Sequence, residues 1–102
     1  MLIVAGVMEV DPAQRDAFIA SKIETLHRNR AEAGCLDFAF TADPIIPGRV
    51  LLYERWEDKA SLAAHLAASR ARVPDPNAAP DVPVLSVDIK QYDIAEIGAV
   101  GS

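Results

Sequence analysis

The sequence predicts an α+β domain of the ferredoxin-like class, in which a four-stranded antiparallel sheet carries two helices on one face. Segments with strand periodicity and segments with helical periodicity follow one another in the order β-α-β-β-α-β. The chain has 102 residues, close to the commonest domain size, and half of them are hydrophobic. We therefore expect residues 1–102 to form a single domain around one core.

The first half of this pattern is a strand followed by a helix. Residues 2–10, LIVAGVMEV, are rich in Val and Ile and are apolar on both faces, as in a buried strand. Asp11 and Pro12 favour a helix start, because Asp caps free amides and Pro suits the first helical position. We expect one helix over residues 12–33, ended by Gly34. Its apolar stripe would consist of Ile19, Ile23 and Leu26.

The middle of the chain predicts two paired strands. Residues 35–43, CLDFAFTAD, alternate in polarity. One face of this strand would carry Leu36, Phe38 and Phe40. Residues 49–57, RVLLYERWE, form the next strand, and the short link containing Pro and Gly makes the two strands antiparallel.

The last part predicts a helix, a loop and a strand. Asp58 opens a helix that runs to about Arg70. Its leucine-bearing face would consist of Leu62, His65, Leu66 and Ser69. Residues 71–83 contain four prolines and predict a surface loop. Residues 84–93 predict the last strand, with Leu85, Val87 and Ile89 in alternation. A slip of the pattern at Tyr92 and Ile94 indicates a bulge or the strand's end.

Composition and charge argue against several classes of partner. With 15 acidic and 10 basic residues, the net charge of -5 disfavours nucleic acid and anionic membranes. The lone Cys35 cannot form an internal disulfide and is expected to be a packed residue. His27 and His65 lie on different predicted helices without a Cys or Asp cluster, which disfavours a metal site. The N-terminus lacks a basic leader, so a cytoplasmic location is expected.

The predicted sheet has a second apolar face. In the third strand, Leu51 and Tyr53 point away from the face that carries Trp56, and the first strand is apolar on both sides. Helices on one side leave this outer face uncovered. We therefore expect a homodimer in which the sheets of two copies face each other.

On the helix-facing side, the pattern is consistent with a small-molecule pocket. Trp56 and His65 would approach each other across a small cavity, with Phe38 and Phe40 as an aromatic wall and the proline-rich loop over the opening. The alternative is that His65 is an ordinary core residue, bonded to a carbonyl group or a carboxylate.

Glu54 is an anomaly on the same strand face. A carboxylate among apolar neighbours needs a partner. The sequence leaves open a hydrogen bond to His65, an ion pair with Arg28 or Arg30, or a side chain that reaches the edge of the sheet.

EAGCLDFAF and LLYERWEDKASLAAHLAAS, within residues 32–69, resemble the antibiotic biosynthesis monooxygenase (ABM) family of the dimeric α/β barrel superfamily. The shared features are a Gly-Cys strand start, an E-x-W strand end and a histidine in the next helix. The resemblance implies oxidation of a phenolic or quinol-type aromatic by molecular oxygen, without flavin, haem or metal. It also implies that His65 is the acid/base or substrate-binding group and that Trp56, Phe38 and Phe40 line the site. By strand alternation, Tyr53 and Arg55 lie on the opposite face and are expected at the dimer interface.

Haem-degrading monooxygenases also resemble this pattern, but they use an Asn on the first strand, and LIVAGVMEV has none. Haem cleavage is therefore not expected. Two other readings remain open. One is isomerisation of a small carbonyl compound, in which His65 would move a proton. The other is a dimeric ligand-binding or stress-related module without turnover, in which His65 and Glu54 satisfy each other.

Overall fold

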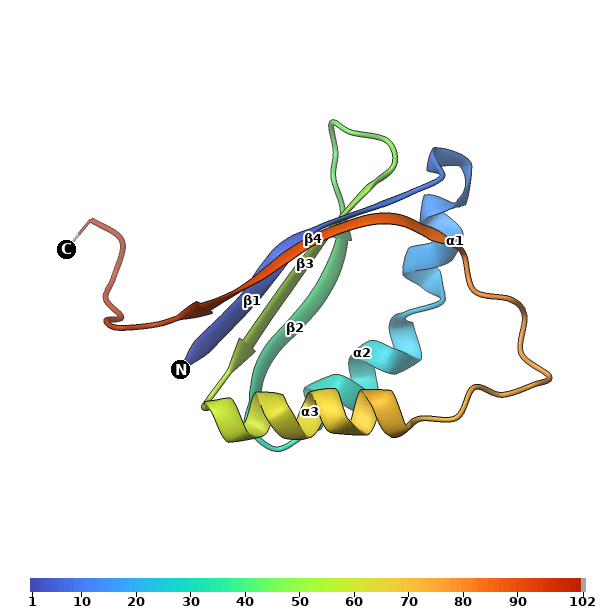
Figure 1. Ribbon diagram of the computed structural model, residues 1–102. Helices are drawn as coiled ribbons and strands as arrows, with labels where there is room; N and C mark the ends of the chain where they lie inside the picture. The colour runs from blue at the N-terminus through green and yellow to red at the C-terminus, as the bar shows by residue number, and fades with distance from the viewer. Residues whose placement is uncertain (102) are drawn as a thin grey trace.

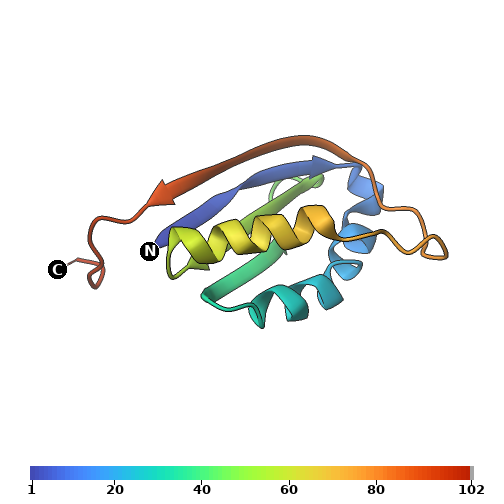
Figure 2. The same cartoon turned by 60° about the horizontal axis from the view of Figure 1, so that its bottom comes forward.

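The computed structural model describes residues 1–101 and confirms the ferredoxin-like class (Figure 1). The elements are β1 (Leu2–Val10), the short 3-10 helix η1 (Pro12–Gln14), α1 (Arg15–Ala20), α2 (Ile23–Arg30), β2 (Cys35–Ala42), β3 (Arg49–Trp56), α3 (Lys59–Ala71) and β4 (Val84–Asp93). All neighbouring strands are antiparallel, in the spatial order β2-β3-β1-β4. The helices lie on one face of the sheet (Figure 2).

The segment predicted as one helix is broken, so that prediction was wrong. The α1 helix ends at Ala20, and the Ser21 hydroxyl donates a hydrogen bond of 2.6 Å to the Phe18 carbonyl oxygen. This side-chain bond competes with the helical pattern at the break. The helix axis changes there, so Ile23 is 49% exposed whereas Phe18 is buried. Phe18, absent from the predicted stripe, packs with Leu26 in the core.

Alternate residues of β3 form the centre of the core, as their period of two predicts. Trp56 and Val50 are fully buried, and Leu52 and Glu54 lie between them on the same face. The complete set of buried hydrophobic residues is Leu2, Met8, Val10, Phe18, Leu26, Phe38, Val50, Leu52, Trp56 and Leu62. The core therefore lies between the sheet and the helices.

The partner strand β2 departs from simple alternation. Its register with β3 shifts between Cys35 and Asp37, which leaves Leu36 in an irregular position and 41% exposed. Only Phe38 and Phe40, of the three residues predicted to share a face, pack on the core. The bulge in β2 therefore keeps the Leu36 side chain out of the core.

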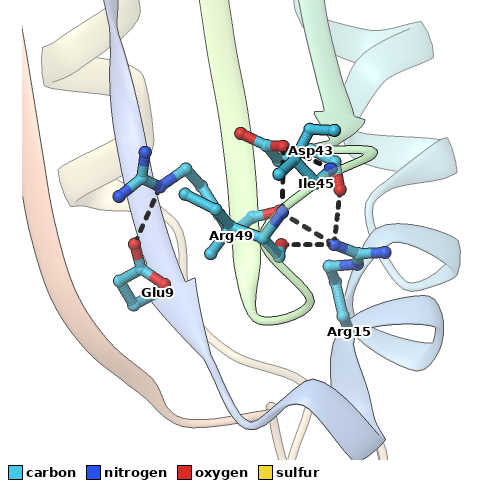
Figure 3. A network of polar contacts seen from close by, with 6 residues as sticks. Glu9, Arg15, Asp43, Ile45 and Arg49 are labelled. Carbon is cyan, nitrogen blue, oxygen red and sulfur yellow. Dashed lines mark hydrogen bonds and ion pairs between the residues drawn. The ribbon is translucent and has the colours of Figure 1, made fainter.

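The turn between β2 and β3 is tied to α1 (Figure 3). The Asp43 carboxylate accepts hydrogen bonds from the amides of Ile45 and Ile46, at 2.8 and 3.1 Å, and these bonds lower the pKa of Asp43. Nη1 of Arg15 donates to the carbonyl oxygens of Asp43 and Ile46, at 2.9 Å each, and more weakly to that of Arg49. One guanidinium thus fixes the hairpin against the first helix.

Asp58 opens α3 as predicted, since its carboxylate accepts a hydrogen bond of 2.7 Å from the Ser61 amide. The second helix, α2, ends at Arg30, three residues before the predicted end, and Ala31 is its C-cap. Gly34 lies in the turn that leads into β2, with a φ of +80°, and its carbonyl oxygen accepts a hydrogen bond from the Glu57 amide. The buried stripe of α3 is narrower than expected: Leu62 and His65 are buried, whereas Leu66 and Ser69 are exposed.

The predicted surface loop lies beyond the end of α3 and returns to β4 (Figures 1 and 2). Its residues 72–81 are all exposed. The β4 strand ends at Asp93, where the apolar pattern slips, and its register shift lies at the opposite end, opposite Glu9 and Val10. No helix within residues 1–101 is long and apolar enough to cross a membrane.

Candidate functional site

The candidate site is centred on His65, which α3 directs toward the sheet. His65 is 6% exposed, and its Nδ1 atom lies 2.9 Å from Oε2 of Glu32. A carboxylate at this distance accepts a hydrogen bond from Nδ1–H, and in that tautomer of the imidazole Nε2 carries the lone pair. Nε2 has no hydrogen-bond partner within residues 1–101. The arrangement therefore orients an imidazole whose second nitrogen can accept a proton.

Aromatic rings enclose this imidazole. The Trp56 ring is tilted by 32° against His65 with 4.8 Å between the ring centroids, and the Phe38 centroid lies 5.5 Å from that of His65. Phe40 follows at 5.8 Å from Phe38 and itself contacts Phe18. The structure thus brings together the aromatic residues that the sequence predicted. The cavity expected between Trp56 and His65 is absent, because the two rings are in direct contact.

Glu54 finds a partner that the sequence did not suggest. Its Oε1 atom accepts a hydrogen bond of 2.9 Å from the indole nitrogen of Trp56, two residues along the same strand face. Burial raises the pKa of the Glu54 carboxyl above its ordinary value of 4.5, against the opposing effects of the Trp56 bond and of nearby His65. The carboxyl is thus a second candidate proton carrier, next to the imidazole.

The expected partners of Glu54 are occupied elsewhere. Nε of Arg30 donates to the Phe38 carbonyl oxygen at 2.8 Å, and Arg28 approaches the Thr25 hydroxyl. His65 bonds Glu32, so the idea that His65 and Glu54 satisfy each other was wrong. Two separate pairs, His65 with Glu32 and Trp56 with Glu54, therefore lie side by side in the aromatic cluster.

Two residues of this region were not predicted as site residues. Glu32 follows α2 and reaches His65 across the gap between the helices. Asn29 is 3% exposed, and its Oδ1 atom is buried without a hydrogen-bond partner in the described chain. The spacing of three residues from buried Leu26 places Asn29 on the inner face of α2, a signal that the sequence did contain.

Grooves lie on both sides of α3. One of 230 Å³ lies between α3 and β4, where Leu66 faces Gln91. Another of 390 Å³ lies between α2 and α3, and Glu32 forms part of its wall. A third, of 280 Å³, lies on the outer face beside Tyr53 and Arg55. His65 lines none of the three, but its partner Glu32 connects it to the second groove.

Neither a thiol nor a metal centre accompanies the cluster. Cys35 is partly buried, and burial, followed by the neighbouring carboxylates, raises its pKa, so the thiol is a poor nucleophile at neutral pH. In the part of the chain that the structure describes, no group of three or more His, Cys, Asp or Glu side chains is arranged to hold a metal ion.

Comparison with known proteins decides the family. The family model described as antibiotic biosynthesis monooxygenase matches residues 1–73, from β1 to the end of α3. The chain belongs to the ABM family. An uncharacterized protein of Synechocystis is 30% identical over 95 residues, which cover 93% of this chain and 64% of that relative. The chain thus spans less than two thirds of the length of this curated relative.

Solved structures share the ABM fold. A protein of Deinococcus radiodurans assigned to the antibiotic biosynthesis monooxygenases is 20% identical, with all of both chains covered and a TM-score of 0.72. One from Nitrosomonas europaea with the same assignment is 15% identical, with 94% of this chain and 100% of the other covered and a TM-score of 0.71. A heme degrader of Mycobacterium tuberculosis, with two hemes in its active site, is 13% identical, with 96% and 100% covered and a TM-score of 0.66. At these identities the likeness concerns the fold.

Proposed function

We propose that this ABM-family protein is a cofactor-independent monooxygenase that oxidises a small phenolic or quinol-type aromatic with molecular oxygen. The observation that carries the proposal is the imidazole of His65, held by Glu32 through Nδ1 and surrounded by aromatic rings, with Nε2 unpaired. Oriented in this way, a buried base can take a proton from a hydroxyl group without competition from water.

The proposed reaction balances without a cofactor. Nε2 of His65 takes the phenolic proton, and the resulting phenolate is electron-rich enough to reduce oxygen. One oxygen atom becomes bonded to the ring and the second leaves as water, so a phenol and one O2 give a quinone and one H2O. All electrons come from the substrate, and the protein orients the ring and moves protons.

The neighbouring residues have separate proposed roles. Trp56, Phe38 and Phe40 form the aromatic wall against which the substrate ring stacks. Glu54, whose pKa is raised by burial, binds the substrate near the Trp56 indole and returns a proton to the departing oxygen. Because Trp56 and His65 touch in the closed cluster, substrate entry requires a change of rotamer at one of them.

Oxygen uptake tests the proposal. The protein is incubated with a panel of phenols and quinols, and oxygen consumption and quinone absorbance are recorded together. We expect turnover with at least one compound and a loss of at least about 100-fold in His65→Ala, the usual contribution of a general base. His27→Ala is the matched control, because His27 is exposed on α2. Equal rates in the two variants would overturn the role of His65.

We further propose that the protein acts as a homodimer joined through the outer sheet face. On that face, Ile3 and Val7 of β1 lie opposite Arg55 and Leu51 of β3, and Tyr53 is 40% exposed. Sedimentation should give the mass of two chains, and Tyr53→Glu should shift it toward one chain, because a buried carboxylate without a partner is costly. A wild-type monomer at micromolar concentration would contradict this proposal.

A dimeric ligand-binding module without turnover is the second candidate. The direct contact of the Trp56 and His65 rings favours it, since a filled cluster stabilises the core as it stands. Binding of a quinol that quenches Trp56 fluorescence, with no oxygen uptake at any pH, would favour this candidate over the enzyme.

A further inference from the structure

The groove between α2 and α3 is lined by three alanines and two arginines, together with Glu32 and Ser61. Its volume of 390 Å³ lies within the range of small-molecule sites. Its lining consists of Arg28, Glu32, Ala33, Ser61, Ala64, Ala68 and Arg72. Ser61, at the start of α3, lies against Gly34, and Arg72 just after α3 lines the same groove as Arg28. The two helices therefore pass each other in opposite directions, and both arginines line the groove between them.

These two arginines have no charged partner. The ion pairs within residues 1–101 engage Arg49, Arg55, Lys59, His65 and Lys90. Arg28 makes only a long hydrogen bond, of 3.5 Å, to the neutral Thr25 hydroxyl. Arg28 lies in the last turn of α2 and Arg72 is the C-cap residue of α3, two positions where a cation offsets the helix dipole. In a chain of net charge -5, two unpaired guanidinium groups beside one groove are complementary to an anion.

The other residues that line the groove indicate which uncharged group of a ligand would fit beside the arginines. Ala33, Ala64 and Ala68 offer a flat, apolar surface without long side chains, which suits one aromatic ring. Glu32 places a carboxylate on the wall, so a second negative charge on the ligand is disfavoured. The same Glu32 accepts a hydrogen bond from Nδ1 of His65, which itself does not line the groove.

We propose that this groove binds a small aromatic monocarboxylate, with its carboxylate on Arg28 and Arg72 and its ring on the alanines. The groove is distinct from the aromatic cluster of the proposed function, because His65 and Trp56 do not line it. Binding itself does not depend on turnover, so the two proposals fail in different experiments.

Calorimetric titration with 4-hydroxybenzoate tests the charge requirement, with the neutral 4-hydroxybenzamide as the matched ligand. We expect the acid to bind at least about 10-fold more tightly at low salt, and high salt to reduce this ratio. The double variant Arg28→Gln/Arg72→Gln should remove the preference. Arg70→Gln should keep it, because Arg70 is an exposed cation of the same helix that does not line the groove.

A second pair of variants tests the location. Ala68→Leu fills the groove and should abolish binding, whereas Ala67→Leu, exposed and outside the groove, should leave it unchanged. Circular dichroism verifies that each variant is folded. Equal affinity for acid and amide, no binding of the acid, or equal effects of the paired variants would overturn this inference. Binding of the acid without oxygen uptake from any phenol would overturn only the proposed function.

Discussion

Nδ1 of His65 and Oε2 of Glu32 lie 2.9 Å apart although 33 residues separate them in the chain. The side chain of His65 is 7% exposed and that of Glu32 is 22% exposed, so the pair lies at the border between core and groove. A carboxylate that accepts a hydrogen bond from one ring nitrogen fixes the orientation of the imidazole. Glu32 is thus a positioning residue for the proposed base.

Glu32→Gln removes the charge but retains the shape of the side chain. We expect oxygen uptake to fall by roughly 10- to 100-fold and the free energy of unfolding to fall by about 1 kcal/mol, because a charge-assisted hydrogen bond becomes a neutral one. Steady-state kinetics and urea denaturation measure the two effects. Glu24→Gln, an exposed acidic position in the first turn of α2, is the control. Full activity of Glu32→Gln would contradict the positioning role.

Glu54 predicts a specific dependence of stability on pH. Its pKa is raised in the folded state, so between the ordinary value of 4.5 and the raised value the folded chain holds more protons than the unfolded chain. The contribution of Glu54 to stability therefore falls as pH rises above about 4.5. Glu54→Gln, whose amide oxygen can still accept from Trp56, should abolish this decline. Urea denaturation of both proteins between pH 4 and pH 8 measures the difference, and parallel curves would refute the prediction.

Gly34 should not tolerate a side chain. Its φ is +80°, and an added Cβ would overlap with the Ser61 side chain at the start of α3. We expect Gly34→Ala to lower the free energy of unfolding by about 2 kcal/mol or more, from backbone strain together with the overlap. Gly101→Ala is the comparison, because Gly101 has a φ of +82° with nothing within 4 Å of an added Cβ. Similar melting temperatures for the two variants would exclude a contribution from the helix contact.

Asn29→Leu should stabilise the protein. The Oδ1 atom of Asn29 is buried without a partner, and such a group costs roughly 1 to 3 kcal/mol. Leu has the same branched arrangement of heavy atoms and no polar atom, so we expect the free energy of unfolding to rise by about 1 kcal/mol. Thermal and urea denaturation measure it, with Asn77→Leu in the exposed loop as the control. A loss of stability would show that the amide makes a bond that Leu cannot replace.

The element order and the inner face of β3 were predictable because both depend on local periodicity. Val50, Leu52, Glu54 and Trp56 share a face in any strand, and Asp58 caps the following helix through a bond to a residue three positions away. The break near Ser21 and the bulge near Leu36 were not predicted. A single side-chain hydrogen bond, or one extra residue in a strand, changes the face on which the neighbouring residues lie, but it does not change the composition of the segment.

The sequence alone therefore determined the fold class, the strand that carries Trp56 and the helix that carries His65. Only the tertiary structure decided that their rings touch, that Glu32 holds His65 and that Glu54 bonds Trp56. The physical reason is distance: local patterns fix which side of an element a residue occupies. Hydrogen bonds and ring contacts require atoms of different elements to lie within a few ångströms, and the packing of helices on the sheet sets that separation.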